Sequence, residues 1–301
     1  MKPGIYPDLE IETYHAAPGV SSSALSHILR SVEHYEAYKA QTFRQSDAMA
    51  FGSAVHLAFL EPALFRAQYI DAKPPHSLDW RRDEAAKMAA QGLHPEEMKD
   101  GKLARTKPET IAGYLEESEV AEMVEHYRQH GEGPAMDEET IANVLRARDN
   151  LDAHPIARNL VLGSQKEVSY FWQDEETGLL CKCRPDIERG DDVWVDLKTT
   201  RDASERSFAK SVQNFGYYRQ GAFYADGSAI ATGIAKSLYV IIAVENTPPF
   251  SVAVYELDHE WIELGRERYR AALRKLHDHQ QNGTWKGYPL QITKLFKPSW
   301  A

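Results

Sequence analysis

The sequence is poor in cysteine and contains no long apolar run. Its two cysteines, Cys181 and Cys183, are separated by one residue, and strand neighbours at that spacing have poor geometry for a disulfide. No stretch approaches the roughly 18 consecutive apolar residues of a membrane helix, so we expect no membrane span. The first residues also lack the apolar segment of a secretory signal. These absences favour a cytoplasmic protein that folds without disulfide bonds.

Positive charge is also in deficit. The chain has 35 Lys and Arg residues against 45 Asp and Glu residues, which gives a formal net charge of −10. Proteins that coat nucleic acid without sequence preference are usually basic, so this balance disfavours that class. An enzyme that acts on nucleic acid stays open, because it can confine positive charge to a groove and recruit divalent cations to an acidic centre.

The periodicity of apolar residues predicts helices first and then a mixture of strands and helices. Residues 1–20 are rich in Pro and Gly, and we expect them to be extended. The predicted helices are residues 22–40, 47–60, 141–162, 203–213, 216–227 and 258–281. The predicted strands are residues 167–172, 179–187, 193–198, 237–245 and 252–257. This order favours an α/β fold with a mixed sheet.

We interpret the chain of 301 residues as one domain with four parts. The segment after residue 70 is highly charged and poor in β-branched residues, which indicates helical pieces with exposed loops. The four parts are an N-terminal helical part (1–70), a helical insertion or subdomain (about 71–165), a sheet core (about 166–257), and a C-terminal helix and tail (258–301).

One stretch concentrates acidic and basic side chains at strand positions. A Pro-Asp pair ends at Asp186 and is followed, after nine intervening residues, by the run Asp-Leu-Lys that begins at Asp196. Because side chains alternate along a strand, Asp196 and Lys198 share one face. If the chain turns back near Gly190, Asp186 lies nearly opposite Asp196, at about 5 Å. Two carboxylates at that distance repel each other unless a cation lies between them, and all-oxygen ligation suits Mg²⁺ or Mn²⁺.

Cationic side chains accompany the acidic pair. Lys182, Arg184 and Asp186 have the same parity, so on one continuous strand they line the same wall and offer cations to a phosphodiester. An ammonium at Lys198 can orient a water or stabilise charge that develops on a phosphate. The alternatives are a solvated polar face for the first group and a surface ion pair with Asp196 for Lys198.

The combined pattern resembles the PD-(D/E)XK nuclease superfamily. Gln220 and Tyr224 lie four residues apart and share a helix face with Tyr217, which resembles the helix over the active site in the RecB-like branch. The run Gly52 to His56 resembles an upstream helix of that branch whose His is an additional metal ligand. The nearest family is the RecE-type exonucleases, typified by the C-terminal domain of exonuclease VIII. The resembling segments are residues 19–25, 52–56, 60–62, 167–169, 183–186, 196–200 and 298–300.

The resemblance implies a nuclease core with a central mixed sheet flanked by helices, and a metal-dependent 5′–3′ exonuclease. Such an enzyme degrades linear double-stranded DNA to 5′-mononucleotides and leaves a 3′ single strand for an annealing protein of recombination. The resemblance further implies Mg²⁺, with Mn²⁺ as a substitute, and a ring-like homo-oligomer (trimer or tetramer). The expected location is the cytoplasm of a bacterial or phage-infected cell.

The same resemblance assigns roles to individual residues. The metal ligands that it implies are Asp186, Asp196, the backbone carbonyl of Leu197, and His56. The catalytic residues that it implies besides the two aspartates are Lys198, Gln220 and Tyr224, the last two as helpers at the DNA backbone or at Lys198. The alternative for His56 is a packed histidine on an apolar helix, and the alternative for Gln220 and Tyr224 is an ordinary polar helix surface.

Four further residues are weaker candidates. Glu167 lies on the first predicted strand and either faces the metal or faces solvent. The helix start that contains Ser21 and Ser23 has free backbone amides that can bind a 5′-phosphate, with Arg30 on the same segment. The alternative for the serines is an ordinary N-cap.

Three other functions remain open at this stage. Members of the CRISPR-associated or helicase-linked branch of the superfamily often hold an iron–sulfur cluster through four cysteines, and two cysteines argue against that cluster here. A restriction endonuclease is disfavoured by the upstream His and the Gln-x-x-x-Tyr helix. A non-catalytic DNA-binding protein on a decayed nuclease fold is disfavoured because both aspartates and the lysine are retained.

Overall fold

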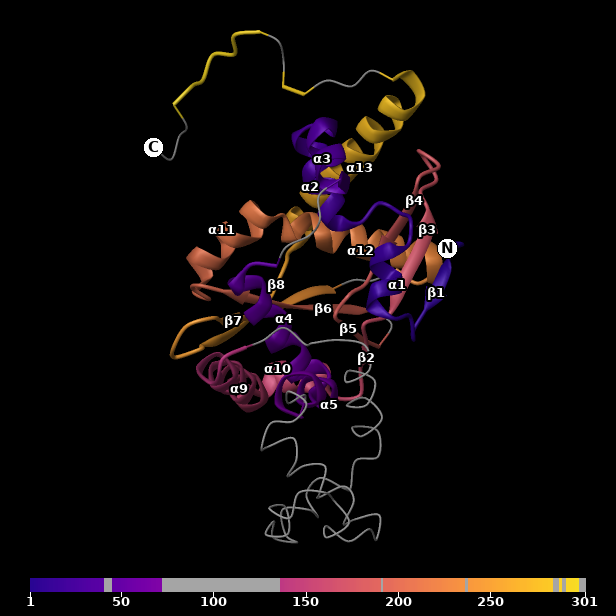
Figure 1. The fold of residues 1–301 in the computed structure, drawn as a ribbon. Helices are drawn as coiled ribbons and strands as arrows, with labels where there is room; N and C mark the ends of the chain where they lie inside the picture. Colours follow the sequence, from indigo (N-terminus) through magenta and orange to yellow (C-terminus); the bar gives the residue numbers. More distant parts are fainter. Residues whose placement is uncertain are drawn as a thin grey trace, which may run out of the picture. The chain divides into compact units, whose positions relative to one another are not determined.

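The computed structural model describes residues 1–40, 45–71, 136–190, 192–235, 238–283, 287–288 and 291–297 (Figure 1). The chain so described forms two compact units. The first consists of Met1–Gln45 and Asn150–Ala301, and the second of Ser46–Asp149. Both sheets and both aspartates of the acidic pair belong to the first unit.

Within the described part of the first unit, five strands form a mixed sheet. In spatial order they are β2 (Gln165–Lys166), β5 (Ile187–Arg189), β6 (Val193–Thr200), β7 (Leu238–Glu245) and β8 (Val252–Glu256). The β6–β7 pair is parallel, and the other pairs are antiparallel. The middle strand β6 is buried from Trp194 to Leu197, which fits its nearly continuous apolar sequence. The predicted α/β fold with a mixed sheet is confirmed.

The hairpin between β5 and β6 sets the register of the acidic pair. Gly190 lies at its turn with a φ of 59°, a conformation that glycine adopts without steric cost. Ile187 pairs with Val195, so one further step in the same register sets Asp186 opposite Asp196. The hairpin therefore forms where the turn residues predicted it.

A smaller antiparallel sheet precedes this hairpin in the chain. Its described strands are, in spatial order, β1 (Gly4–Tyr6), β3 (Ser169–Gln173) and β4 (Leu180–Cys183). The prediction of one strand over residues 179–187 is wrong, because β4 ends in this sheet and β5 starts in the other. Pro185 lies between the two strands. A proline has no N–H for a ladder and restricts the residue before it, so the chain leaves one sheet there and enters the other.

Three helices of the first unit follow or cover the large sheet. They are α11 (Glu205–Phe215), α12 (Tyr217–Thr232) and α13 (His259–Asn282), close to the predicted spans. In Figure 1, α12 passes above β6. The contact is close, because a Cβ added to Gly221 would lie 2.8 Å from the ring of Tyr239 on β7. The indole N–H of Trp194 also donates to Ser228 Oγ on α12 at 3.2 Å.

Gly265 allows α13 to pack directly on α12, and its replacement by alanine is expected to destabilise the fold. A Cβ at this position would lie 2.3 Å from the backbone oxygen of Tyr218, and a backbone atom cannot rotate away. We expect the free energy of unfolding to fall by about 2 kcal/mol, since overpacking outweighs the helix propensity gained. Chemical denaturation measures this, with Arg268→Ala on an exposed position of α13 as the control. Equal stability of the two variants would contradict the close packing.

The N-terminal segment is more structured than predicted. Residues 1–20, expected to be extended, contain β1 and helix α1 (Ile11–Ala16). The single helix predicted over 22–40 is two helices, α2 (Ser22–Arg30) and α3 (Val32–Ala40). The break lies at Ser31, whose hydroxyl oxygen accepts a hydrogen bond from the His34 N–H at 3.2 Å. A serine that caps the next helix competes with continuation of the first one.

The second unit is helical in its described part. Its helices are α4 (Asp47–Leu60), α5 (Pro62–Phe65), a π-helical turn (Arg66–Asp71) and most of α9 (Glu138–Ala153). The helix predicted over 141–162 is interrupted, since α10 (Pro155–Val161) begins anew at a proline. The predicted insertion lies largely outside the described residues, as does the segment 298–300. No described helix is long and apolar enough to cross a membrane.

Candidate active site

Strand β6 presents a buried acid and a lysine on one face. The side chain of Asp196 is 1% exposed and that of Lys198 is 19% exposed, and the two form an ion pair. Burial opposes the charge on Lys198, but the carboxylates of Asp196 and Asp186 outweigh that effect and raise the lysine pKa above its usual value. Lys198 is therefore a persistent cation beside a buried carboxylate.

Side chains of helix α12 contact both Asp196 and Lys198. The Nε2 group of Gln220 donates to Asp196 Oδ1 at 2.9 Å. The ring of Tyr217 lies with its centroid 5.1 Å from Lys198 Nζ, a cation–π distance. Gln220 and Tyr217 are three residues apart and therefore lie on one helix face. The helix thus orients the acid and the lysine together.

The second acid comes from the connection into β5. The backbone N–H of Leu197 donates to Asp186 Oδ2 at 2.6 Å, so Asp186 is tied directly to the strand that contains Asp196. The negative charge of Asp186 also helps to raise the pKa of Lys198. The structure therefore brings Asp186, Asp196 and Lys198 together at one end of the hairpin.

Glu167 is a third acidic residue near Asp186. It lies between β2 and β3 with a φ of 55°, a left-handed conformation that non-glycine residues rarely adopt and that concentrates at functional sites. Its N–H donates to the carbonyl oxygen of Asp186 at 3.2 Å. A carboxylate oxygen of Glu167 lies within 4.8 Å of one of Asp186. Its other partner is Arg184, whose Nε donates to Glu167 Oε2 at 2.8 Å.

This donor set fits a hard divalent cation. The carboxylates of Glu167 and Asp186 could hold it, since oxygen ligands suit Mg²⁺ and Mn²⁺, and Asp196 stays a predicted ligand. Opposite ligands of a Mg²⁺ ion are about 4.2 Å apart, so the spacing of Glu167 and Asp186 needs only a small side-chain adjustment. The backbone carbonyl of Leu197 stays a predicted ligand.

Lys182 and Arg184 were predicted to line a wall that faces DNA. Both instead donate hydrogen bonds to other groups of the protein. Lys182 is 6% exposed, and its ammonium donates to three backbone carbonyls at the C-terminal end of α1. Arg184 donates to the Leu9 carbonyl at 2.6 Å and to Ser169 Oγ at 3.2 Å, besides its pairing with Glu167. The strand assumed in the parity argument ends at Cys183, although both cations lie over the ring of Tyr14, at 4.8 and 5.9 Å from its centroid. Other groups of the protein hold both side chains, and DNA binding by them stays a prediction.

The proposed phosphate site at the start of α2 has the geometry of an ordinary helix start. Ser21 is the N-cap residue, and its hydroxyl oxygen accepts from the Ala24 N–H at 3.4 Å. Ser23 is exposed in the first turn, whereas Arg30 is the last residue of the helix and lies at its other end. Arg30, expected near this helix start, is therefore at the opposite end of α2. Phosphate binding at this helix start stays a prediction.

Two buried tyrosines lie near the acids. Tyr224, one turn after Gln220, is buried, and burial followed by Tyr14 and Asp196 raises its pKa well above the usual value. The other residue, Tyr239, was not among the site residues predicted from the sequence. It pairs with Trp194 across the parallel β6–β7 ladder, so it shares the face of Asp196, and among the described residues its hydroxyl has no hydrogen-bond partner. Only the pairing of the two strands reveals this position.

The remaining predicted ligand, His56, lies on α4 in the second compact unit. Its imidazole is half-buried. Its role as a metal ligand stays a prediction.

The comparisons with known proteins agree with this geometry. Residues 21–289 match the family model described as "PDDEXK-like domain of unknown function (DUF3799)". The chain belongs to this family. The superfamily predicted from the acid–acid–lysine pattern is therefore confirmed. No curated protein matches the chain.

Solved structures resemble this PDDEXK-like domain in fold. A putative exonuclease from Eubacterium rectale is 13% identical with a TM-score of 0.58, and the match covers 97% of this chain and 96% of that one. An alkaline exonuclease from Laribacter hongkongensis is also 13% identical, with a TM-score of 0.26 over 45% of this chain and 71% of that one. At these identities, the first likeness concerns the fold alone.

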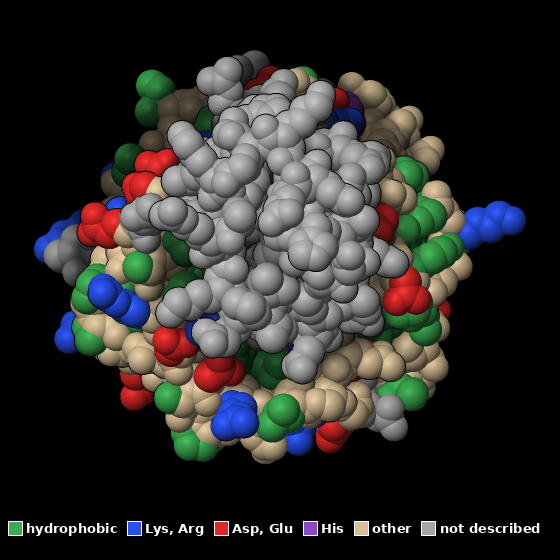
Figure 2. All heavy atoms as spheres, turned by 60° about the horizontal axis from the view of Figure 1, so that its bottom comes forward, with side chains coloured by type: hydrophobic (Ala, Val, Ile, Leu, Met, Phe, Trp, Pro, Cys, Tyr) green, Lys and Arg blue, Asp and Glu red, His purple; other side chains and the backbone are tan. Residues whose placement is uncertain are grey.

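Surface charge on this PDDEXK-like domain is mixed. On the face shown in Figure 2, the described Lys and Arg side chains are scattered among Asp and Glu side chains. The basic residues on that face therefore form no broad positive surface among the described side chains, which fits the net charge of −10.

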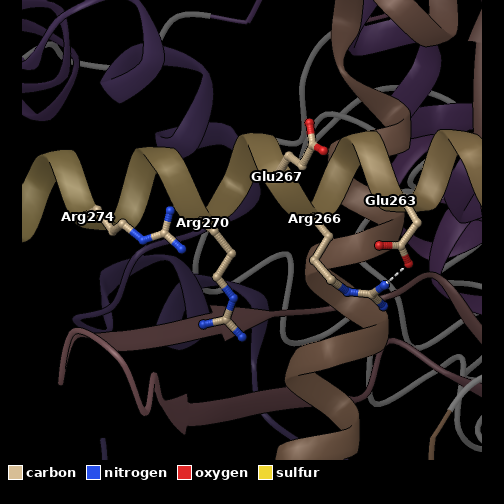
Figure 3. A pocket seen from close by; sticks show the side chains of 5 residues that line it. All are labelled: Glu263, Arg266, Glu267, Arg270 and Arg274. Carbon is tan, nitrogen blue, oxygen red and sulfur yellow. Dashed lines mark hydrogen bonds and ion pairs between the residues drawn. The ribbon is translucent and has the colours of Figure 1, made fainter.

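A shallow hollow lies along α13 of the PDDEXK-like domain (Figure 3), and none of its lining residues belongs to the acidic centre. Its lining residues are Glu263, Arg266, Glu267, Arg270 and Arg274. The three arginines are paired with carboxylates, namely Arg266 with Asp226, Arg270 with buried Asp174, and Arg274 with Glu176. Because its cations are already neutralised, we assign this hollow a structural role in anchoring α13.

Proposed function

We propose that this PDDEXK-like domain is a metal-dependent exodeoxyribonuclease that degrades linear double-stranded DNA from 5′ to 3′. The observation that supports it most is the convergence of Asp186, Asp196 and Lys198 at one end of the β5–β6 hairpin. Two acids that can share a cation, with an ammonium beside them, suit hydrolysis of a phosphodiester. The acids retain this arrangement because Leu197 and Gln220 donate hydrogen bonds to them.

Each residue of the centre has a distinct role in the proposed reaction. Asp186, Asp196 and Glu167 hold the divalent ion, which when bound makes water easier to deprotonate and neutralises phosphate charge. Lys198 orients the attacking water or stabilises the negative charge that grows on the phosphate. Gln220 keeps the Asp196 carboxylate in place, and His56 is proposed as a further ligand.

The finer parts of the proposal rest on the RecE-type resemblance. They are the release of 5′-mononucleotides, the 3′ single strand passed to an annealing protein of recombination, a ring-like homo-oligomer, and a cytoplasmic location. The resembling segments are scattered from residue 19 to residue 300 and include the Asp-Leu-Lys-Thr-Thr run that starts at Asp196.

The deciding experiment is digestion of linear duplex DNA that is labelled at its 5′ or its 3′ end. We expect acid-soluble 5′-mononucleotides with Mg²⁺ or Mn²⁺, none with chelator, and earlier release of the 5′ label. Closed circular duplex is the control and is expected to stay intact. Cutting of circles would indicate an endonuclease instead, and binding of DNA without any product would indicate a non-catalytic protein.

Gln220→Ala is expected to slow DNA degradation about ten-fold without unfolding the protein. The substitution removes a hydrogen bond to a buried carboxylate, and such charge-assisted bonds contribute about 1.5–3 kcal/mol. Initial rates at saturating Mg²⁺ measure the effect. Gln213→Ala, at an exposed position of α11, is the matched control and should retain full activity. An unchanged rate for Gln220→Ala would remove Gln220 from the centre.

A further inference from the structure

One aromatic side chain protrudes beside the candidate active site. Phe215, the last residue of α11, is 65% exposed. It continues the helical stripe of Phe208 and Val212, both of which are buried. Its neighbours in sequence, Gln213 and Asn214, are exposed and polar, so the exposed apolar surface at this end of α11 is the single ring of Phe215. That area is far below what a protein partner needs for stable docking.

Phe215 is separated from the catalytic lysine by one ring. Its centroid lies 5.7 Å from that of Tyr217, with the ring planes 29° apart. Tyr217 in turn contacts the ammonium of Lys198, at 5.1 Å from its centroid. The ring of Tyr217 also has its centroid 6.2 Å from that of Phe208. Phe215 is thus the exposed end of a row of rings that leads to the acidic centre.

Buried groups hold this ring in a defined position. Gly216 connects α11 to α12 with a φ of 72°, in the left-handed region that favours glycine. A Cβ at Gly216 would lie 2.6 Å from the guanidinium of Arg219. Arg219 is itself buried and bonds to Ser26 of α2. The turn that presents Phe215 is therefore packed against a buried side chain, and the ring itself stacks on Tyr217, so the ring is preorganised.

A flat, preorganised aromatic ring near a phosphodiester-cleaving centre suits a nucleobase. Bases stack on aromatic side chains whatever their sequence, because each base has a π-face. We propose that Phe215 stacks on a nucleobase of the DNA strand being degraded and so positions the scissile phosphate at Lys198. The proposal rests on the proposed nuclease function and names a substrate contact that supplies no charge. It also gives an acidic protein a way to hold DNA without a broad basic surface.

The test compares Phe215→Ala, Phe215→Leu and Phe215→Trp on duplexes with one abasic position at or near the 5′ end. We expect the KM for intact DNA to rise about 5- to 100-fold in the Ala and Leu variants, with Trp restoring it. On DNA that lacks the stacking base, the wild type should be as weak as Phe215→Ala. Phe296→Ala, at another exposed Phe (77%), is the matched control and should bind normally.

A second readout is independent of cleavage. In the inactive Asp186→Asn background, a 2-aminopurine at the stacking position should be quenched on binding, and Phe215→Ala should abolish the quenching. Equal losses on intact and abasic DNA, or unchanged quenching in Phe215→Ala, would overturn the stacking role while the nuclease proposal stands. Absence of both DNA binding and degradation in the wild-type protein would overturn both proposals.

Discussion

Asp186→Asn is expected to lower DNA degradation by at least about a thousand-fold and to abolish tight binding of Mg²⁺ or Mn²⁺. A thousand-fold loss corresponds to about 4 kcal/mol of transition-state stabilisation. The asparagine oxygen still accepts the Leu197 N–H, which lies 2.6 Å from Asp186 Oδ2, so the hairpin should fold normally. What is lost is the negative charge that a hard cation requires. Calorimetric titration with Mn²⁺ and digestion of linear duplex measure the two losses.

The control for this experiment is Asp192→Asn, at an exposed position of the same hairpin. It removes the same charge but lies away from the acids, so metal binding and activity should stay normal. Retention of tight Mn²⁺ binding in Asp186→Asn would remove Asp186 from the ligand set. An unfolded Asp186→Asn protein would instead show that the Leu197 hydrogen bond depends on the charge of its acceptor.

Lys198→Met is expected to lower DNA degradation about 10²- to 10³-fold and to destabilise the metal-free protein. The activity loss follows from removal of a preorganised cation, which has effects of this size in other enzymes. The stability loss follows because Asp196, 1% exposed, loses its partner charge. Removing one member of a buried pair costs several kcal/mol. Since Lys198 is 19% exposed, we expect about 1–3 kcal/mol here.

A double-mutant cycle separates the two effects. Asp196→Asn combined with Lys198→Met removes both charges and should be more stable than Lys198→Met alone, because no unpaired carboxylate remains buried. Its activity should be no higher than that of either single variant. Chemical denaturation in the presence of chelator measures the stability of the variants, and initial rates with Mg²⁺ measure their activity. Additive stability losses would show that the ion pair between Asp196 and Lys198 does not stabilise the fold. Unchanged activity in Lys198→Met would show that Lys198 takes no part in the reaction.

Much of the centre was predictable because its members are close in the chain. Asp186, Asp196 and Lys198 occupy one hairpin, whose register depends on strand alternation and on the turn at Gly190. Gln220 was singled out because its helix resembles the one over the active site in RecB-like nucleases, and the structure places its side chain on Asp196. Patterns of period 2 and 3.6 express local backbone geometry, so the residues alone reveal them.

Other parts depended on contacts between distant segments. One strand was predicted where Pro185 divides two sheets, and the prediction did not anticipate that Lys182 and Arg184 both bond to backbone carbonyls of the N-terminal segment. In the fold, Lys182 donates hydrogen bonds to carbonyl groups at the end of α1, more than 160 positions away in the chain. No periodicity encodes such a partner.

The sequence by itself therefore determined the mixed sheet and the acid–acid–lysine hairpin, since these follow from spacing within short segments, and the resemblance of its motifs to known nucleases predicted the superfamily. Only the tertiary structure decided that Glu167 joins Asp186, that Tyr239 shares the face of Asp196, and that Phe215 stays exposed beside Tyr217. Those relations arise when separate strands and helices pack together. Burial and charge are properties of the packed arrangement, and a linear pattern of residue types does not specify them.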